Sequence, residues 1–195
     1  MSRIAEVSRK TKETDIELRL DIDGSGKGKI YTGVGFFDHM LNGMARHGFM
    51  DLDVSVKGDL EVDDHHTIED CGIVLGKAIA QAVGNKAGIK RFGSCILPMD
   101  ETLAMCAVDL SGRPYFNYDV EFPAEMAGDM HTEMVREFFY AVSYSAGMNI
   151  HIKLMDGCNA HHIAEAVFKA FGRALDEATT RDPRISDVLS TKGSL

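Results

Sequence analysis

The sequence predicts an α+β protein built from an internally duplicated βββαβα unit. Three observations support this prediction: short segments with alternating apolar residues, longer segments with an apolar helical stripe, and the recurrence of both in the same order. Each half is too small to bury both faces of its own sheet. We therefore expect two sheets, each with helices on one face, packed against each other.

The first unit begins with alternating apolar residues between Ile16 and Ile22, which indicate a half-buried strand. The glycine-rich segment DGSGKGK suits a hairpin turn, and KIYTGV would be the returning strand. A helix is predicted over 36–46, then a strand at LDVSV, and then a long helix from Asp64. The apolar stripe of that last helix consists of Ile68, Cys71, Leu75, Ala78, Ile79, Ala82 and Val83.

The second unit repeats this order. Strands are predicted near 90–97, 103–110 and 115–121, a helix near 131–146, a strand at 148–154 and a helix over 160–179. We accordingly assign residues 1–88 to the first repeat and 89–180 to the second. Residues 181–195 form a tail outside the repeat, which we expect to contribute to the substrate site.

Composition excludes several classes of protein. No apolar run approaches the roughly 18 residues that cross a bilayer, and the start of the chain lacks the apolar core of a secretory signal. A cytoplasmic protein without a membrane partner is expected. The four cysteines show no CxxC spacing, so we expect them to be reduced. A net charge of -9 argues against nonspecific binding to nucleic acid, which needs many cationic contacts to phosphate.

Two histidine pairs stand at matching positions of the two repeats, in HHTIED at 65–70 and HHIAEA at 161–166. Residues three or four apart share a helix face, so Glu69 should lie beside both His65 and His66, while the two histidines diverge by about 100°. Each pair should therefore serve two ions. The second set is His161, His162 and Glu165.

Imidazole and carboxylate together suit Mn, Fe, Co, Ni or Zn, and the absence of nearby cysteine argues against a soft thiolate site. One such motif alone would also fit a solvated helix face. Its recurrence favours a dinuclear metal site. His39 precedes His65 by about the interval at which Glu137 precedes His161, so each half offers four potential ligands. For Glu137 the alternative is an exposed helix carboxylate.

Basic residues next to turn signals are candidates for binding an anion. Arg91 and Arg113 stand at strand boundaries, Lys169 lies two turns along the helix after His161, and Lys192 is near the end of the chain. Each could instead be an ordinary surface charge. DGSGKGK is not a P-loop, because it lacks the GxxxxGK[ST] spacing and no helix follows it at once.

The motifs FFDHML, ARHG, DDHHTIED, PMDETLA, DLSGRPY, HHIAEAVFKAFGRAL and STKG together resemble the imidazoleglycerol-phosphate dehydratases of histidine biosynthesis. The resemblance covers essentially the whole chain in the right order. It implies a homo-oligomer in which trimers assemble into a 24-mer, with manganese sites between subunits. Ligands from the two HHxxE motifs of one chain then need not meet within that chain.

The resemblance also implies roles for individual residues. Two Mn²⁺ ions per active site would be held by His39, His65, His66, Glu69, His161, His162 and Glu165. Glu137 in REFF stands where many relatives have a histidine ligand in EHFF. The substrate phosphate would be bound by Arg91, Arg113, Lys169, Ser190 and Lys192. Glu13 in TKET matches a glutamate that contacts substrate and transfers protons, whereas Gly43 replaces a glutamine that touches substrate in several relatives.

The implied reaction is loss of water from D-erythro-imidazole glycerol phosphate, which gives imidazole acetol phosphate. The proton to be removed lies beside an imidazole ring and is weakly acidic. If both ring nitrogens bind Mn²⁺ as imidazolate, the ring can expel the neighbouring hydroxyl through a diazafulvene-like intermediate. Glu13 is the candidate acid or base, with metal-bound water as its competitor, and Glu69 and Glu165 complete the catalytic set.

The bare motif leaves two other functions open. One is a dinuclear metallohydrolase that cleaves a phosphate ester with a bridging hydroxide. The other is a metal-dependent assembly module in which the ions join subunits without any reaction.

Overall fold

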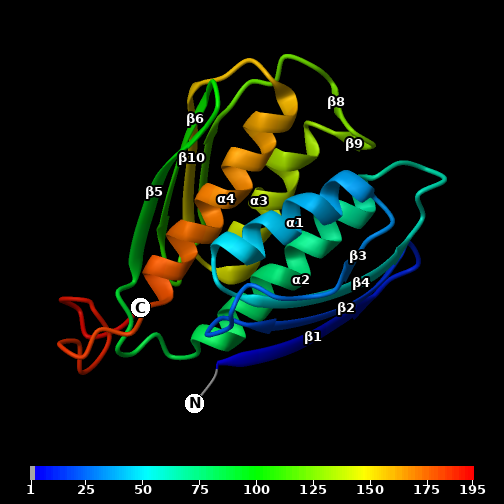
Figure 1. Cartoon of the computed structure of the whole chain (residues 1–195). Helices are drawn as coiled ribbons and strands as arrows, with labels where there is room; N and C mark the ends of the chain where they lie inside the picture. The colour runs from blue at the N-terminus through cyan, green and yellow to red at the C-terminus, as the bar shows by residue number, and fades with distance from the viewer. Residues whose placement is uncertain (1–2) are drawn as a thin grey trace.

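The computed structural model describes residues 3–195. Within that range, two four-stranded sheets enclose four α-helices, and each sheet carries its helices on the inner face (Figure 1). None of the helices in the described range is long and apolar enough to cross a membrane.

The first repeat contains a sheet with the strand order β1-β2-β4-β3. Side chains alternate along β2 between the buried face, with Ile16, Leu18 and Leu20, and the outer face, as the period of a strand requires. The elements in chain order are β1 (Ile4–Lys10), β2 (Thr14–Asp21), β3 (Ile30–Tyr31), α1 (Gly35–His47), β4 (Asp51–Gly58) and α2 (His65–Val83).

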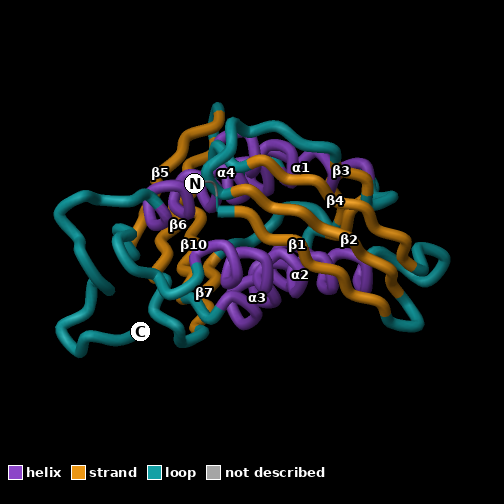
Figure 2. The backbone as a smooth tube through the Cα atoms, turned by 90° about the horizontal axis from the view of Figure 1, so that it is seen from below, coloured by secondary structure: helices purple, strands orange, loops and turns teal. Residues whose placement is uncertain are grey.

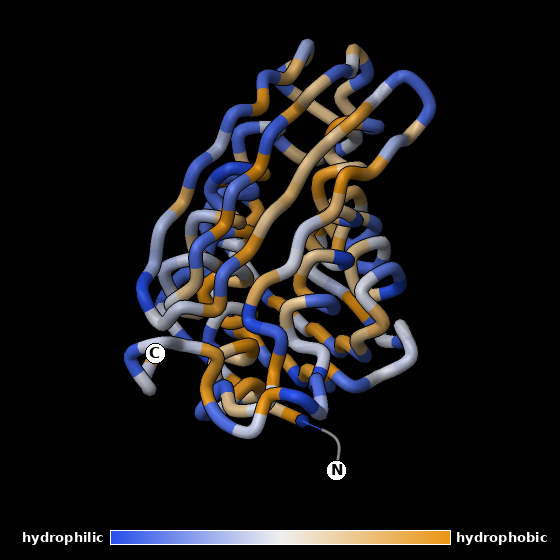
Figure 3. Tube along the Cα trace, turned by 90° about the vertical axis from the view of Figure 1, so that its left-hand side faces the viewer, coloured by the Kyte–Doolittle hydropathy of each residue, from blue (hydrophilic) through white to orange (hydrophobic). Residues whose placement is uncertain are grey.

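The second repeat has the equivalent strand order, β5-β6-β10-β7, and in both sheets the third and fourth strands pair in parallel. This correspondence confirms the predicted duplicated α+β architecture. Figure 3 views the outer side of the second sheet, where hydrophilic and hydrophobic residues mix along the strands. The elements are β5 (Phe92–Met99), β6 (Thr102–Asp109), β7 (Tyr115–Asp119), β8 (Met126–Ala127), β9 (Met130–His131), α3 (Met134–Ala146), β10 (Asn149–Asp156) and α4 (Ala160–Thr179).

The helices pack crosswise between the repeats. α2 lies against α3 and α1 lies against α4, as Figures 1 and 2 both show. The shared core is aromatic: the ring of Phe37 on α1 lies 5.3 Å from that of Phe138 on α3 and 6.3 Å from that of Phe168 on α4. Because neither repeat closes this core alone, side chains from both repeats meet along the α1 and α4 helices.

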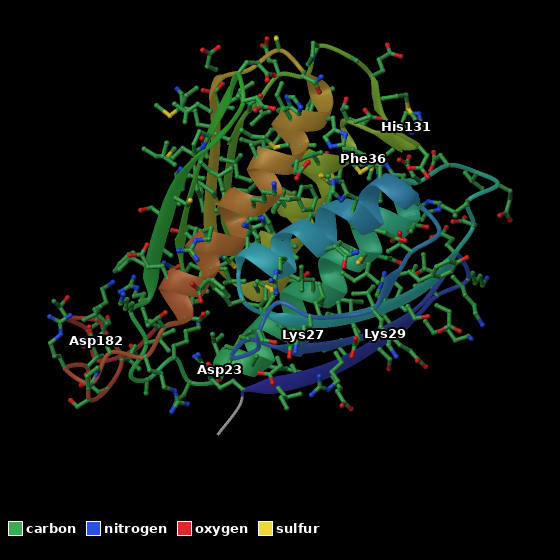
Figure 4. All side chains as sticks on the ribbon, in the orientation of Figure 1. Asp23, Lys27, Lys29, Phe36, His131 and Asp182 are labelled. Atoms are coloured by element: carbon green, nitrogen blue, oxygen red, sulfur yellow. The ribbon has the colours of Figure 1, made fainter. Side chains whose placement is uncertain are left out.

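The predicted hairpin at DGSGKGK is wrong. β3 pairs in parallel with β4 and does not return beside β2, whose two neighbours are β1 and β4. The glycine-rich segment instead runs along β4, where the carbonyls of Lys27 and Lys29 accept from the amides of Leu52 and Val54 (Figure 4). A Cβ on Gly28 would collide with the Leu52 carbonyl, so this glycine permits close backbone approach.

Two features of the fold were not predicted: residues 4–10 form the edge strand β1, and the short β8–β9 hairpin precedes α3. The helix predicted near 131–146 is α3, which begins at Met134. Asp64, from which the long helix was expected to run, directly precedes α2, and its side chain makes no capping bond. Asp64 instead accepts from the backbone amide of His131 at 2.8 Å and contacts its Nδ1 at 2.7 Å, which joins the β8–β9 hairpin to the start of α2 (Figure 4).

Candidate functional site

The strongest candidate site lies between α1 and α4 and draws on both repeats. The side chains of His39, His161 and Glu165 converge there: each offers one ligand atom, and the three atoms lie within 4.8 Å of one another. His161 Nε2 is 3.0 Å and His39 Nε2 is 3.4 Å from Glu165 Oε2. The start of α4 is fixed by Asn159, whose side chain accepts from the backbone amides of His161 and His162.

Glu165 is the buried member of this cluster, with 8% of its surface exposed. Burial opposes its ionisation, but hydrogen bonds from Lys169 and His161 and the charge of His39 outweigh burial, so the pKa of Glu165 is lowered. Lys169 Nζ lies 2.5 Å from Glu165 Oε1. The ring of Phe36, at the start of α1 (Figure 4), packs edge-on against His161 with centroids 5.0 Å apart.

The HHxxE motif of the first repeat is more open. His65 Nε2 lies 3.7 Å from Glu69 Oε2, while the expected contact between Glu69 and His66 does not form. Glu137 accepts a hydrogen bond from Arg136 at 2.6 Å and takes no part in the three-residue cluster. The metal ligands expected from the sequence therefore do not all come together within the described part of one chain.

His66 and His162 turn away from the glutamates of their own motifs toward other carboxylates. His66 Nδ1 is 3.0 Å from Asp59 Oδ2, and its Nε2 is 3.9 Å from Glu13 Oε1. His162 Nδ1 is 2.8 Å from Glu101 Oε2. Each carboxylate raises the pKa of its histidine, chiefly through the hydrogen bond, and His162 lowers the pKa of Glu101 to about 2.

A second region contains most of the predicted phosphate residues. Arg91, Arg113, Ser190 and Lys192 line a cavity of about 560 Å³ between the second sheet and the C-terminal tail. Arg91 is held in place, because it donates to both oxygens of Asp109 at 2.7 and 3.1 Å and to the Leu189 carbonyl at 2.8 Å. The guanidinium of Arg113 has no ion pair or hydrogen bond within residues 3–195, so it is available to an anion. Lys169 does not line this cavity and lies at the α1–α4 cluster.

The two carboxylates that face the Nδ1 atoms of His66 and His162, Asp59 and Glu101, were not predicted. A signal for Glu101 was present, because DET at 100–102 follows β5 as KET at 12–14 follows β1, so Glu101 matches Glu13 in the other repeat. No comparable repeat relation indicates Asp59, which follows β4.

The donor set fits a divalent cation of the harder or borderline kind. Two imidazoles and one carboxylate converge, sulfur is not among the converging atoms, and the ammonium of Lys169 already compensates the negative charge of Glu165. His39 and His161 are each about half exposed, so additional ligands can approach the same point.

These features define the chain as a duplicated α+β protein with a candidate metal site shared between its repeats and a separate basic cavity. The family model for imidazoleglycerol-phosphate dehydratase matches residues 32–175. The chain therefore belongs to the imidazoleglycerol-phosphate dehydratase family; it is an enzyme, a dehydratase of histidine biosynthesis.

Individual relatives agree with this assignment over the full length. The chain is 64% identical to imidazoleglycerol-phosphate dehydratase of Lachnoclostridium phytofermentans and 62% identical to that of Acetivibrio thermocellus, with 100% of both chains covered in each case. The crystal structure of the Staphylococcus aureus enzyme superposes with a TM-score of 0.84 at 40% identity, covering 92% of this chain and 99% of that one. The Pyrococcus furiosus enzyme in complex with (S)-C348 gives 0.84 at 38% identity, with 97% and 100% covered.

Proposed function

We propose that this enzyme converts D-erythro-imidazole glycerol phosphate to imidazole acetol phosphate and water with two Mn²⁺ ions per active site. The observation that carries the proposal is the convergence of His39, His161 and Glu165 in a chain of the dehydratase family. The reaction also needs a binding site for the substrate phosphate, and the basic cavity beside the tail would provide it.

The three converging side chains would form most of one metal site. The remaining candidate ligands, which are His65, His66, Glu69, Glu137 and His162, would complete both sites when copies of the chain come together. Bound manganese would act as a Lewis acid on the ring nitrogens and hold the substrate as imidazolate. The chain's own part would be to orient the ring through these ligands, of which His161 is packed against the ring of Phe36.

We also propose that the enzyme is a cytoplasmic homo-oligomer with shared active sites, built as the trimers and 24-mer of the family, and the same geometry supports this proposal. Only one group of three candidate ligands converges within residues 3–195, while the first HHxxE motif stays open. The outer face of the first sheet offers a surface for a neighbour: it forms a groove of about 630 Å³ lined mostly by polar residues, which include Glu17, Arg19, Asp53 and the exposed Tyr31.

Glu13 is the candidate acid or base. It lies in the β1–β2 turn, where its backbone amide donates to Thr11 Oγ1 at 3.0 Å, and its exposed carboxylate reaches to 3.9 Å from His66 Nε2. A carboxylate so close to a candidate metal ligand can exchange protons with a substrate bound there. Metal-bound water is the competing group.

For the phosphate, the tail residues Ser190 and Lys192 and the strand-end residues Arg91 and Arg113 would hold one end of the substrate. Lys169 would act beside the metal, where it already contacts Glu165. Fixing the phosphate in this way would align the substrate carbon with the base and the ring.

The direct test is incubation of purified, Mn²⁺-loaded protein with imidazole glycerol phosphate. We expect the keto product to accumulate with no release of inorganic phosphate, and chelation to stop turnover. Release of phosphate would indicate a metallohydrolase. Dissociation of the oligomer on chelation, without reaction of the loaded protein, would indicate an assembly module.

A further inference from the structure

His162 and His66 hold equivalent positions in the two repeats, and in both the Nδ1 atom faces a carboxylate. The distances are 2.8 Å to Glu101 Oε2 and 3.0 Å to Asp59 Oδ2. A carboxylate only accepts hydrogen bonds, so at each histidine it favours the form with a proton on Nδ1. When the ring is neutral, Nε2 then keeps its lone pair for a metal ion.

The two carboxylates come from different places in the repeat. Asp59 follows β4, the strand just before α2, whereas Glu101 lies in the turn between β5 and β6. The repeat counterpart of Glu101 is Glu13, which approaches the other nitrogen of His66, Nε2. Simple duplication of one contact would have placed the accepting carboxylate at the same position in both repeats. The Nδ1 contact is thus present in both repeats although its source differs, which points to a requirement for this orientation.

Glu101 is also fixed by its second oxygen. Oε1 accepts from the backbone amide of Asn159 at 3.0 Å, from that of Cys158 at 3.4 Å and from Thr102 Oγ1 at 3.1 Å. All of these groups are donors. An amide in place of the carboxylate would have no suitable orientation. In one orientation its NH₂ group would face these donors. In the other it would face Nδ1, which would then have to accept a hydrogen bond and leave the proton on Nε2.

We propose that Glu101 is a positioning residue that holds His162 in the Nδ1–H form, so that Nε2 is free to bind metal, and that Asp59 does the same for His66. The metal in this inference rests on the proposed function. Outer carboxylates of this kind typically change metal affinity by about 10- to 100-fold.

The experiment compares Mn²⁺ affinity, measured by competition titration, in the wild type, Glu101→Gln and Asp59→Asn. Glu101→Gln should weaken Mn²⁺ binding by about 10- to 100-fold. Asp59→Asn should cause a smaller loss, because both Asp59 oxygens lie near His66 Nδ1 and the amide can rotate to present its oxygen. Unchanged affinity in a folded Glu101→Gln protein would overturn the proposal.

Thr102→Val is the matched control, because it removes a partner of the same Glu101 carboxylate without touching His162. It should lower thermal stability and leave Mn²⁺ affinity within about twofold of the wild type. An equal loss of affinity in Thr102→Val and Glu101→Gln would indicate a merely structural role for Glu101 and contradict the proposal.

A second measurement does not depend on how the variants fold. Nitrogen NMR of the metal-free wild type, at a pH that keeps the imidazole neutral, should show His162 with its proton on Nδ1. A proton on Nε2 would overturn the proposal. Failure of the wild type to bind Mn²⁺ or to form the keto product would instead contradict the proposed function, so the two failures are distinguishable.

Discussion

His39 Nε2 lies 3.4 Å from Glu165 Oε2, and this contact joins α1 of the first repeat to α4 of the second. The contact exists because the four helices pack crosswise, α1 on α4 and α2 on α3. A duplicated unit that packed its helices only within each repeat would leave the two residues apart. The crosswise core therefore creates the candidate metal site as well as stabilising the fold.

Replacement of Glu165 by glutamine should remove Mn²⁺ and turnover together. The neutral amide cannot replace the negative carboxylate that lies among His39, His161 and Lys169 and would bind the cation. Metal content by atomic spectroscopy, with turnover measured on the same sample, checks this expectation. Glu69→Gln should have the same effect. The control is Glu177→Gln on α4, where the remaining oxygen can still accept from the Ser94 amide; loss of metal there would argue against a specific role for Glu165.

Glu13→Gln should separate metal binding from chemistry. Glu13 lies in an exposed turn and contacts a candidate ligand only at 3.9 Å, so its replacement should leave the Mn²⁺ content unchanged. Turnover should fall by about 10²- to 10⁴-fold if its proton transfer is needed. Full turnover in this variant would leave metal-bound water as the acid or base.

The two arginines of the basic cavity should behave differently. Arg113→Ala should raise KM by about 10- to 100-fold, as expected for the loss of about 1.4 to 3 kcal/mol from a charge-assisted hydrogen bond, and barely change stability. Arg91→Ala should also lower thermal stability, because Arg91 holds Asp109 and the Leu189 carbonyl. Steady-state kinetics and thermal unfolding of both variants check this difference, and equal stability losses would contradict it.

The sequence predicted the duplicated α+β fold well, for a physical reason. Alternation in β2 and the stripe on α2 are local patterns that burial imposes on any such element, and they can be read without knowing the partner. The duplicated histidine pairs were likewise visible as spacing.

The sequence did not show which distant segments and side chains come together in the fold. The glycines of DGSGKGK signal close backbone approach as readily as a turn, and only the position of β4 decides between the two. The partners Asp59 and Glu101 lie in loops whose side-chain directions depend on the assembled sheets. The same holds for Glu137, which Arg136 engages in place of the cluster.

Gly43 offers a test of the helix that carries His39. A Cβ at this position would lie 3.9 Å from Lys169 Cε, which is ordinary contact, so alanine fits. Gly43→Ala should raise the free energy of unfolding by about 0.5 to 1 kcal/mol, because glycine in a helix interior costs backbone entropy. Chemical denaturation measures this gain. A loss of stability would show that the α1–α4 contact cannot accept a methyl group.

The Arg3–Asp23 pair should make stability depend on pH in a defined direction. Arg3 donates to both oxygens of Asp23, at 3.0 and 2.6 Å, and to the Thr179 carbonyl at 2.8 Å, so it ties the start of the chain to the end of α4. The hydrogen bond from Arg3 is the main reason that the pKa of Asp23 is lowered in the folded protein. The folded state therefore holds the charged carboxylate more strongly than the unfolded chain does.

Asp23→Asn should lower the free energy of unfolding at pH 7 by about 1 kcal/mol, the usual upper value for a partly exposed pair. Because the folded-state pKa is lowered, this difference should stay constant above the ordinary carboxyl pKa of 3.8 and disappear as the pH falls through the lower folded-state value. Urea titrations of both proteins from pH 7 downward measure the gap. A gap that widens with falling pH would mean that the pair does not stabilise the charged form of Asp23.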